Sequence, residues 1–410
     1  MDKPGKFSTY QKLVILGLSC LLFTVVLDYM LLPALSGTLL AELQLSTEQF
    51  GLISSAYALS AGISALLASG FADRFERKSF LLVFYTGFLA GILLCAISPS
   101  FPFLLAARIL TGAFGGMMAS ICFAIVADLF PVSQRGRVTG WIQMAFAASL
   151  VIGLPLSLFI ASSFSWQMAY GLILSLGILA LLMVLVLIRP LKNSSTSFSP
   201  PWEHLISNLK KPSYWTVYSA NMLIVGGDVI FMTFNAAFLT NNLGLADSQL
   251  PYVYGAVGLT SLLAAPIFGK LADRFGKWPV FAFGTLLSTG AVLVYTAGVI
   301  QAFEWIILMH AGLYLGINAR MVSATALATA VPKKSDRGAF LAIDSSIQQL
   351  AGGLAAAVAG FVIFQAADGN LLYYPQIGWL IAILMLLSAG LVLLVSNQVK
   401  ADIRSKKIKS

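Results

Sequence analysis

Five ionisable side chains lie inside long apolar runs of this 410-residue chain: Asp28, Arg108, Asp228, Arg320 and Asp344. A charge at the depth of a lipid bilayer costs about 2.5–3.5 kcal/mol, so each of these residues needs a partner or a wet cavity. Burial disfavours an ionised carboxylate, whereas a neighbouring arginine favours it, so a carboxylate whose arginine moves away can bind a proton. The chemistry that these five residues predict is therefore proton coupling.

Their positions along the runs predict two pairs. Counting about 1.5 Å per helical residue places Asp28 and Arg108 at similar heights past the middle of the membrane. Asp228 occupies the corresponding height in the second half of the chain. Arg320 and Asp344 lie near the middle or just to its inner side, and we expect them to form the second pair. The alternative for each pair is a static salt bridge that fixes helix packing.

Polar side chains accompany these charges. Asn221, Asp228 and Asn235 recur every seven residues, which keeps them nearly on one helical face. Other polar or aromatic residues lie beside Asp28, Arg320 or Asp344. Together they predict a cavity for a small amphipathic or polar solute, with substrate-binding residues Tyr29, Asn221, Asn235, Tyr314, Asn318 and Gln348. For any single one of them, a hydrogen bond between helices is the alternative.

Membrane-spanning helices must carry these residues. The chain is 59% hydrophobic and 10% charged, against about 25% charged in soluble proteins. A span needs about 20 mostly apolar residues. Twelve segments qualify: 12–36, 50–72, 79–98, 101–130, 138–162, 167–188, 213–240, 250–271, 278–300, 303–330, 339–366 and 376–397.

The chain also repeats itself with an offset close to 200 residues. Asp28 corresponds to Asp228, and Gly112-x-x-x-Gly116 corresponds to Gly312-x-x-x-Gly316. The repeat predicts an all-α membrane protein of two pseudo-symmetric six-helix bundles, and paired halves around a central site are typical of secondary transporters. The predicted domains are a first bundle (1–188), a cytoplasmic linker with a helix on the membrane surface (189–212), and a second bundle with a short basic tail (213–410).

Basic residues follow the even-numbered spans, as at Arg77, Arg135 and Lys211, whereas the opposite loops contain no Lys or Arg. This bias predicts that both termini are cytoplasmic, in a multi-pass protein of the cell membrane. The net charge of +9 then faces the lipid headgroups rather than nucleic acid.

No cofactor, metal or enzymatic activity is expected. The three cysteines lie in apolar runs and the spans contain one histidine, which does not suffice for a metal cluster or a nucleophile with its base. The expected partners are the lipid bilayer, a small-molecule substrate and protons, and a monomer is expected. A non-transporting receptor is the alternative from another class, although the C-terminal tail is only about a dozen residues long.

Two loops connect these observations to a known family. Gly269-Lys270-Leu271-Ala272-Asp273-Arg274-Phe275-Gly276-Lys277 resembles the cytoplasmic loop signature of the major facilitator superfamily, and residues 69–78 keep its Asp-Arg core. In that family these residues latch the cytoplasmic face in the outward-open state. The resemblance, which covers the whole chain, therefore implies a cytoplasmic gate made of Asp73, Arg74, Arg77, Asp273 and Arg274, with Asp128 as the partner of Arg77.

Two spans resemble particular branches of that family. Arg108 with Gly112, Gly115 and Gly116 is similar to the motif of proton-coupled members. Ser149-x-x-x-Gly153-Leu154-Pro155 is a loose version of the antiporter motif. The chain thus resembles the twelve-span drug/sugar-efflux branch (drug–proton antiporter 1-like, arabinose-efflux-like). This implies proton-coupled efflux of a small organic solute by alternating access, driven by the proton gradient; a proton-coupled importer or a facilitator is the alternative.

Overall fold

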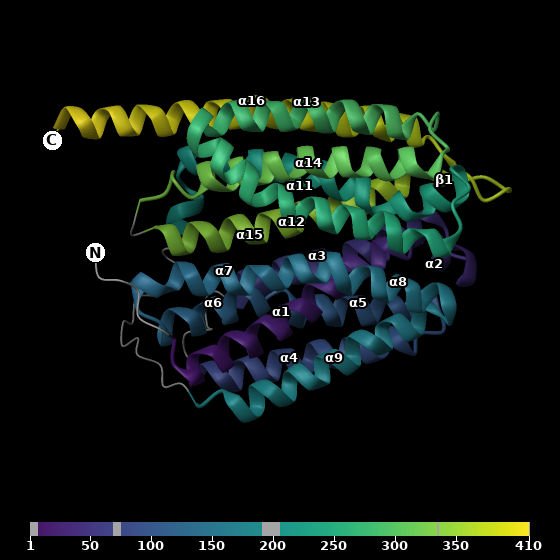
Figure 1. Ribbon diagram of the computed structural model, residues 1–410, viewed down its shortest axis with the longest axis horizontal. Helices are drawn as coiled ribbons and strands as arrows, with labels where there is room; N and C mark the ends of the chain where they lie inside the picture. Colours follow the sequence, from purple (N-terminus) through teal and green to yellow (C-terminus); the bar gives the residue numbers. More distant parts are fainter. Residues whose placement is uncertain (1–6, 69–74, 191–205, 334–335, 410) are drawn as a thin grey trace.

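In the computed structural model, residues 7–68, 75–190, 206–333 and 336–409 are described, the side chains of 68, 132–133 and 403–409 excepted. Within these residues, twelve helical segments are long and apolar enough to cross a membrane. The expected all-helical class with twelve spans is confirmed (Figure 1). The first part of the predicted surface helix of the linker lies in residues 191–205, outside the described residues, whereas residues 206–209 are described and are helical.

The N-terminal half contains six spans. Its helices are α1 (Thr9–Ala34), α2 (Ser36–Glu42), α3 (Thr47–Ala68), α4 (Arg77–Ala96), α5 (Phe101–Gly115), α6 (Met118–Leu129), α7 (Val132–Ala148), α8 (Leu154–Ser163) and α9 (Trp166–Leu187). Two of the spans are interrupted. The fourth consists of α5 and α6, and the fifth consists of α7 and α8 joined by a π-helical turn, η2 (Ser149–Gly153).

The C-terminal half also contains six spans. Its elements are α11 (Pro212–Ala237), the π-helical turn η3 (Phe238–Asn242), the 3-10 turn η4 (Asp247–Gln249), α12 (Leu250–Phe275), α13 (Lys277–Thr296), α14 (Phe303–Ala328), α15 (Arg337–Val362) and α16 (Tyr374–Lys409). A short antiparallel hairpin of β1 (Phe364–Gln365) and β2 (Leu371–Leu372) joins the last two helices and pairs Phe364 with Leu372.

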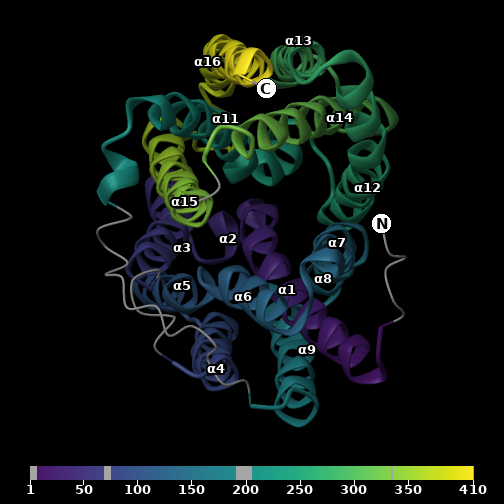
Figure 2. The ribbon, with the colours of Figure 1, turned by 90° about the vertical axis from the view of Figure 1, so that its left-hand side faces the viewer.

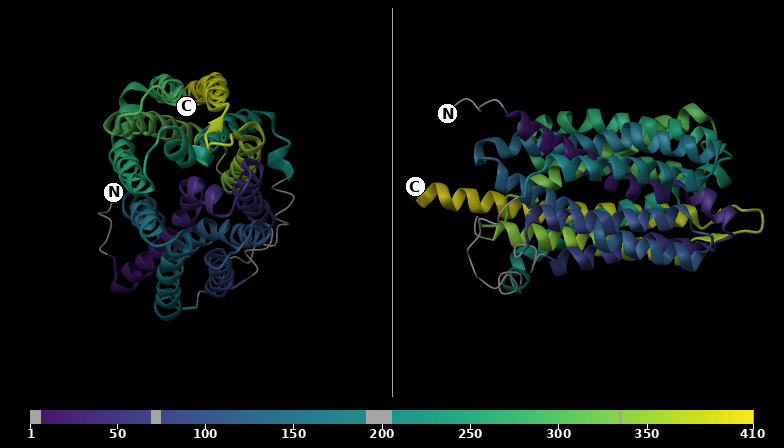
Figure 3. Two further views of the ribbon diagram at one scale, coloured as in Figure 1. Left: turned by 90° about the vertical axis from the view of Figure 1, so that its right-hand side faces the viewer. Right: turned by 90° about the horizontal axis from the view of Figure 1, so that it is seen from below.

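The two ends of the bundle differ in charge. We call the end where α1 begins and α16 finishes the basic end, because the connections there carry Arg77, Arg135 and Lys211. The opposite, acidic end carries the hairpin and residues such as Glu48 and Asp247. Views along and across the bundle show α16 extending past its neighbours at the basic end and the hairpin projecting at the acidic end (Figure 3).

The halves are joined most tightly near the acidic end. Thr47 Oγ1 donates a hydrogen bond to the carbonyl of Ile363 (2.6 Å), and the N–H of Ala237 donates to Ser36 Oγ (2.9 Å). Helix α3 lies along α15, and α12 lies against η2 and α8 (Figure 2). At the α3–α15 crossing only glycine fits, because a Cβ on Gly360 would lie 2.9 Å from the Cα of Gly51.

Local sequence explains how α3 begins. Ser46 Oγ accepts from the N–H of Gln49 (3.2 Å), and Gln49 Oε1 accepts from the N–H of Ser46 (3.1 Å). This reciprocal capping box satisfies two backbone donors that the first turn of a helix leaves without partners. Glu48, in the same first turn, places a negative charge where the helix dipole favours it.

Candidate functional site

A cavity of about 670 Å³ lies between the two halves. The N-terminal half contributes α1, α7 and α8, and the C-terminal half contributes α11, α12 and α14. We call it the central cavity. Five of the residues selected from the sequence line it: Tyr29, Asp228, Asn235, Tyr314 and Asn318. These residues come from α1, α11 and α14, so the predicted cavity gathers side chains from both halves.

Most of its wall is apolar. Four methionines line it, namely Met30, Met144, Met232 and Met321, together with aliphatic residues and Phe146. Methionine is unbranched and polarizable, so it adapts to ligands of different shape. Such a wall suits the apolar body of a solute, while the few polar groups orient it.

The cavity is closed on one side. At its acidic-end boundary, Asn235 and Tyr254 are buried. Toward the basic end, the wall includes Gly140, Gln143 and Met321, all of them exposed. Together with the contacts that join the halves at the acidic end, this places the opening toward the basic end.

Asp228 is the acidic residue in the wall of this cavity. Its Oδ1 accepts a hydrogen bond from Arg320 Nη1 at 3.1 Å, across the contact between α11 and α14. The Asp228 side chain is 14% exposed, whereas Arg320 is fully buried. Arg320 Nη2 also lies 3.5 Å from Ser388 Oγ of α16. The prediction that Arg320 pairs with Asp344 is therefore wrong, because Asp228 on α11 reaches the guanidinium instead.

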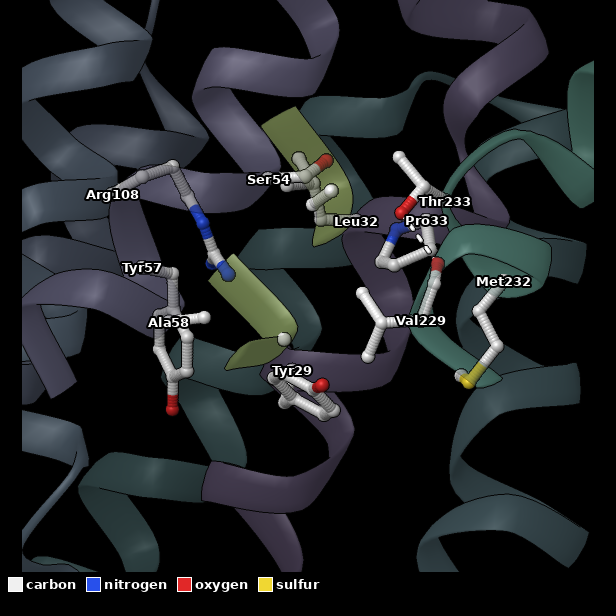
Figure 4. A pocket seen from close by; sticks show the side chains of 12 residues that line it. Tyr29, Leu32, Pro33, Ser54, Tyr57, Ala58, Arg108, Val229, Met232 and Thr233 are labelled. Atoms are coloured by element: carbon white, nitrogen blue, oxygen red, sulfur yellow. Dashed lines mark hydrogen bonds between the residues drawn. The ribbon is translucent and has the colours of Figure 1, made fainter. Parts of the chain in front are cut away.

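Asp28 and Arg108 form a second pair, as predicted. Arg108 Nη1 donates to Asp28 Oδ1 at 2.7 Å, and both side chains are buried within the N-terminal half. The guanidinium lies 4.5 Å from the ring centre of Tyr57. Figure 4 shows Arg108, Tyr57 and Tyr29 around a small void of about 20 Å³. This void shares Tyr29 and Val229 with the wall of the central cavity, so one layer of side chains separates the pair from it.

Asp344 belongs to a separate cluster between α11 and α15. Asn221 Nδ2 donates to both of its carboxylate oxygens (2.9 and 3.0 Å), and Gln348 Nε2 donates to Oδ2 (2.9 Å). Asn221 and Gln348 do not line the central cavity in the described part of the chain, so their predicted placement there is wrong. A seven-residue repeat drifts by about 20° per repeat on a straight helix, and the carboxylate on α15 draws Asn221 to that side.

A buried polar network lies at the acidic-end boundary of the cavity. Tyr295 Oη donates to Asn235 Oδ1 (2.8 Å), and Asn235 Nδ2 lies 3.2 Å from His310 Nε2 and 3.4 Å from Tyr254 Oη. His310 Nδ1 donates to the carbonyl of Ile306 (2.9 Å). This leaves Nε2 of a neutral imidazole as an acceptor for the amide of Asn235. The network fixes the side chain of Asn235 where it meets the cavity.

The residues of the expected gate lie at the basic end. Arg77 Nε donates to Asp128 Oδ2 at 3.0 Å, the contact that the family resemblance implied. Asp273 accepts from Lys277 (2.6 Å), and the Arg274 guanidinium lies 5.2 Å from the ring centre of Phe275. Each of these contacts stays within its own half. Asp73 and Arg74 lie outside the described residues.

Sequence reasoning missed several residues of the cavity wall. Gln143 and Tyr254 are polar residues inside apolar spans, and the same criterion that selected Asn235 would have found them. The sequence does not reveal the methionines of the wall, because an apolar side chain in an apolar span can face lipid, a neighbouring helix or a cavity.

Two halves of six spans each among the described residues, with ion pairs at membrane depth and a cavity between them, define a membrane transporter. The sequence profile of the Major Facilitator Superfamily matches residues 17–234 and again residues 217–409. The chain belongs to the major facilitator superfamily. The double match coincides with the internal repeat.

Two relatives come from Bacillus subtilis (strain 168). The uncharacterized MFS-type transporter YceJ is 29% identical over 299 residues, which are 72% of this chain and 74% of the relative. The uncharacterized MFS-type transporter YbcL is 22% identical over 354 residues, 86% of this chain and 88% of the relative.

Solved structures share the fold. A bacterial homologue of the human lysosomal transporter Spinster, inward-facing and unoccupied, superposes with a TM-score of 0.76 at 15% identity, covering 97% of this chain and 99% of the other. The nucleoside transporter NupG gives a TM-score of 0.74 at 13% identity, covering 93% and 99%. At these identities the likeness concerns the fold alone.

Proposed function

We propose that this transporter exports amphipathic small organic molecules from the cell in exchange for protons. The observation that carries the proposal is the position of Asp228, which lines the central cavity and at the same time pairs with Arg320. A carboxylate that borders both the bound solute and the Arg320 guanidinium can switch from one of these partners to the other. The apolar, methionine-containing wall supports an amphipathic solute, and the arginine and glycine pattern of the fourth span supports proton coupling.

The charge difference between the two ends supports the orientation. Basic connections stay on the cytoplasmic side of membrane proteins, so we place the basic end, and with it both termini, in the cytoplasm. The central cavity then opens inward and is closed toward the outside. A solute enters it from the cytoplasm, and rocking of the two halves exposes it to the other side.

Coupling follows from the Asp228–Arg320 contact. While Arg320 is near, the carboxylate is stabilised in its ionised form; when the helices rock and the guanidinium withdraws, burial favours the protonated acid. Protons taken up from outside and released inside then drive the outward step. In this cycle Asp344, held by the amides of Asn221 and Gln348, is a second group at membrane depth that can accept a proton.

Transport in inside-out membrane vesicles tests the proposal. With an acidic lumen, vesicles carrying the wild-type protein are expected to accumulate members of a panel of amphipathic dyes. Asp228→Asn removes the proton-binding group and keeps the shape, so accumulation is expected to fall at least tenfold while downhill exchange persists. Asp368→Asn, which removes an exposed carboxylate of the same half outside the gate and the cavity, is the control.

Two outcomes would contradict the proposal. Full accumulation by Asp228→Asn would remove this carboxylate from the coupling. Accumulation only in right-side-out vesicles with an acidic exterior would identify an importer.

A further inference from the structure

A second large hollow lies on the outer side of the N-terminal half. It has a volume of about 1020 Å³ and is bounded by α1, α7 with η2, and α9. We call it the lateral groove. Its walls are mostly apolar, with Leu16, Ile152 and Leu179 among the exposed lining residues. Because these helices cross the membrane, lipid chains are the medium that this groove meets.

Two cations line the basic end of the lateral groove. Lys12 lies near the start of α1, and Arg137 lies near the start of α7. Both side chains are exposed, and neither forms an ion pair with another described residue. The Arg137 guanidinium rests 4.3 Å from the ring centre of Phe7, which also lines the groove. This contact fixes the position of the guanidinium at the basic end of the lateral groove.

The length of the groove matches one leaflet. On α1 it extends from Lys12 to Thr24, a rise of roughly 18 Å at 1.5 Å per residue. Half of the hydrocarbon core of a bilayer measures about 15 Å. The cations therefore lie where headgroups lie, and the apolar walls reach about as deep as an acyl chain of the same leaflet.

We propose that the lateral groove binds an anionic phospholipid, with an acyl chain between α1, α7 and α9 and the headgroup phosphate on Lys12 and Arg137. A zwitterionic lipid offers the same chains but no net negative charge, so the two cations select for the anionic headgroup. The proposal depends on the groove alone and holds whatever the transporter carries.

The site has a direct connection to the central cavity. Met144 of α7 lines both hollows, so α7 is the wall between them. The same helix directs Arg137 to the groove and Gln143 to the central cavity. A lipid in the lateral groove would pack against the face of α7 that points away from the central cavity. It would thereby stabilise the position that α7 has while the cavity is open at the basic end.

Native mass spectrometry and thermal unfolding of the purified, delipidated full-length protein test the site. Titration with phosphatidylglycerol is expected to give a bound lipid and a higher unfolding temperature, and phosphatidylcholine a weaker effect. Each cation near an anionic headgroup contributes a factor of about five in binding, so Lys12→Gln with Arg137→Gln is expected to weaken phosphatidylglycerol binding roughly 10- to 30-fold. Ser19→Phe, which fills the groove, is expected to reduce the binding of both lipids.

The matched control is Lys210→Gln with Lys400→Gln, which removes two exposed cations outside the groove and is expected to bind phosphatidylglycerol as the wild type does. Equal binding of phosphatidylglycerol by the groove double variant and the wild type would overturn the proposal. So would equal affinity of the wild type for the two lipids.

Discussion

At the scale of single residues, each of two intramembrane arginines neutralises one carboxylate of a different helix, but only one pair meets the central cavity. Arg320 holds Asp228, which is 14% exposed, whereas Arg108 holds an Asp28 that is fully buried. An ion pair without access to solvent cannot exchange a proton in this state. In this state the Asp28–Arg108 pair links α1 to α5, and proton exchange there would need a state that opens the pair to water.

This difference gives a prediction for stability. Removing one partner of a buried ion pair costs about 3–5 kcal/mol, because the other charge is left uncompensated. We expect Asp28→Ala to lower the unfolding temperature in detergent markedly, and Asp28→Leu combined with Arg108→Met to recover most of the loss. An unfolding temperature of Asp28→Ala equal to that of the wild type would show that the pair does not stabilise this state.

The sequence predicts such residues only in part. Counting residues along a span gives the depth of a charge, which sufficed for Asp28 and Arg108. It does not say which neighbouring helix the side chain faces. Arg320 has both Asp228 and Asp344 within reach by depth, and only the packing of α14 against α11 and α16 decides between them.

At the scale of elements, the contact between α3 and α15 depends on glycine. A Cβ on Gly360 would lie 2.8 Å from the carbonyl oxygen of Thr47 and 2.9 Å from the Cα of Gly51, so the two backbones touch. Small residues allow such an approach between membrane helices. The two halves must also separate at this contact between α3 and α15 if the acidic end is to open.

Gly360→Leu is therefore expected to shift the protein toward the state that is open at the acidic end. In a variant without native cysteines, Tyr29→Cys in the cavity wall is expected to react at least several-fold faster with an impermeant maleimide applied from the acidic side when Gly360→Leu is present. Gly290→Leu, at an exposed position with open space, is the control. Unchanged labelling in a folded Gly360→Leu protein would refute the role of this contact.

Hydropathy predicted the helices well but not their interruptions. The π-helical turn η2 begins at Ser149, whose Oγ lies 2.9 Å from both the Phe23 carbonyl of α1 and the Ala145 carbonyl of its own helix. A side chain that hydrogen-bonds to a neighbouring helix and to its own backbone competes with the backbone hydrogen bonds of its own helix. Pro155, two residues after η2, also lacks the N–H that would continue the α-helical ladder, so the break has a local cause as well as a tertiary one.

At the scale of the whole molecule, the acidic end is closed by contacts between α2 and the end of α11, and between α3 and α15. The internal repeat predicted two halves and a site between them. It could not predict which end is open, because the same helices are buried in both states and only a few contacts between the halves differ.

A disulfide across the closed end tests alternating access. A Cβ on Gly37 would lie 3.7 Å from the Cβ of Thr240, within the range of about 3.5–4.5 Å that disulfides require. Gly37→Cys with Thr240→Cys, without the native cysteines, is expected to cross-link under mild oxidation and to lose transport by more than 90%, and reduction is expected to restore it.

Each single cysteine variant serves as a control for oxidation and is expected to keep transport. Undiminished transport by the cross-linked protein would show that the acidic end need not open.

The methionine-lined wall also makes the carrier chemically vulnerable. Oxidation turns a flexible thioether into a polar, chiral sulfoxide, and two of the four methionines of the cavity, Met144 and Met321, are exposed. Peroxide is therefore expected to weaken the binding of apolar solutes before it unfolds the helices. Methionine sulfoxide reductase would then restore a working binding surface without resynthesis of the protein.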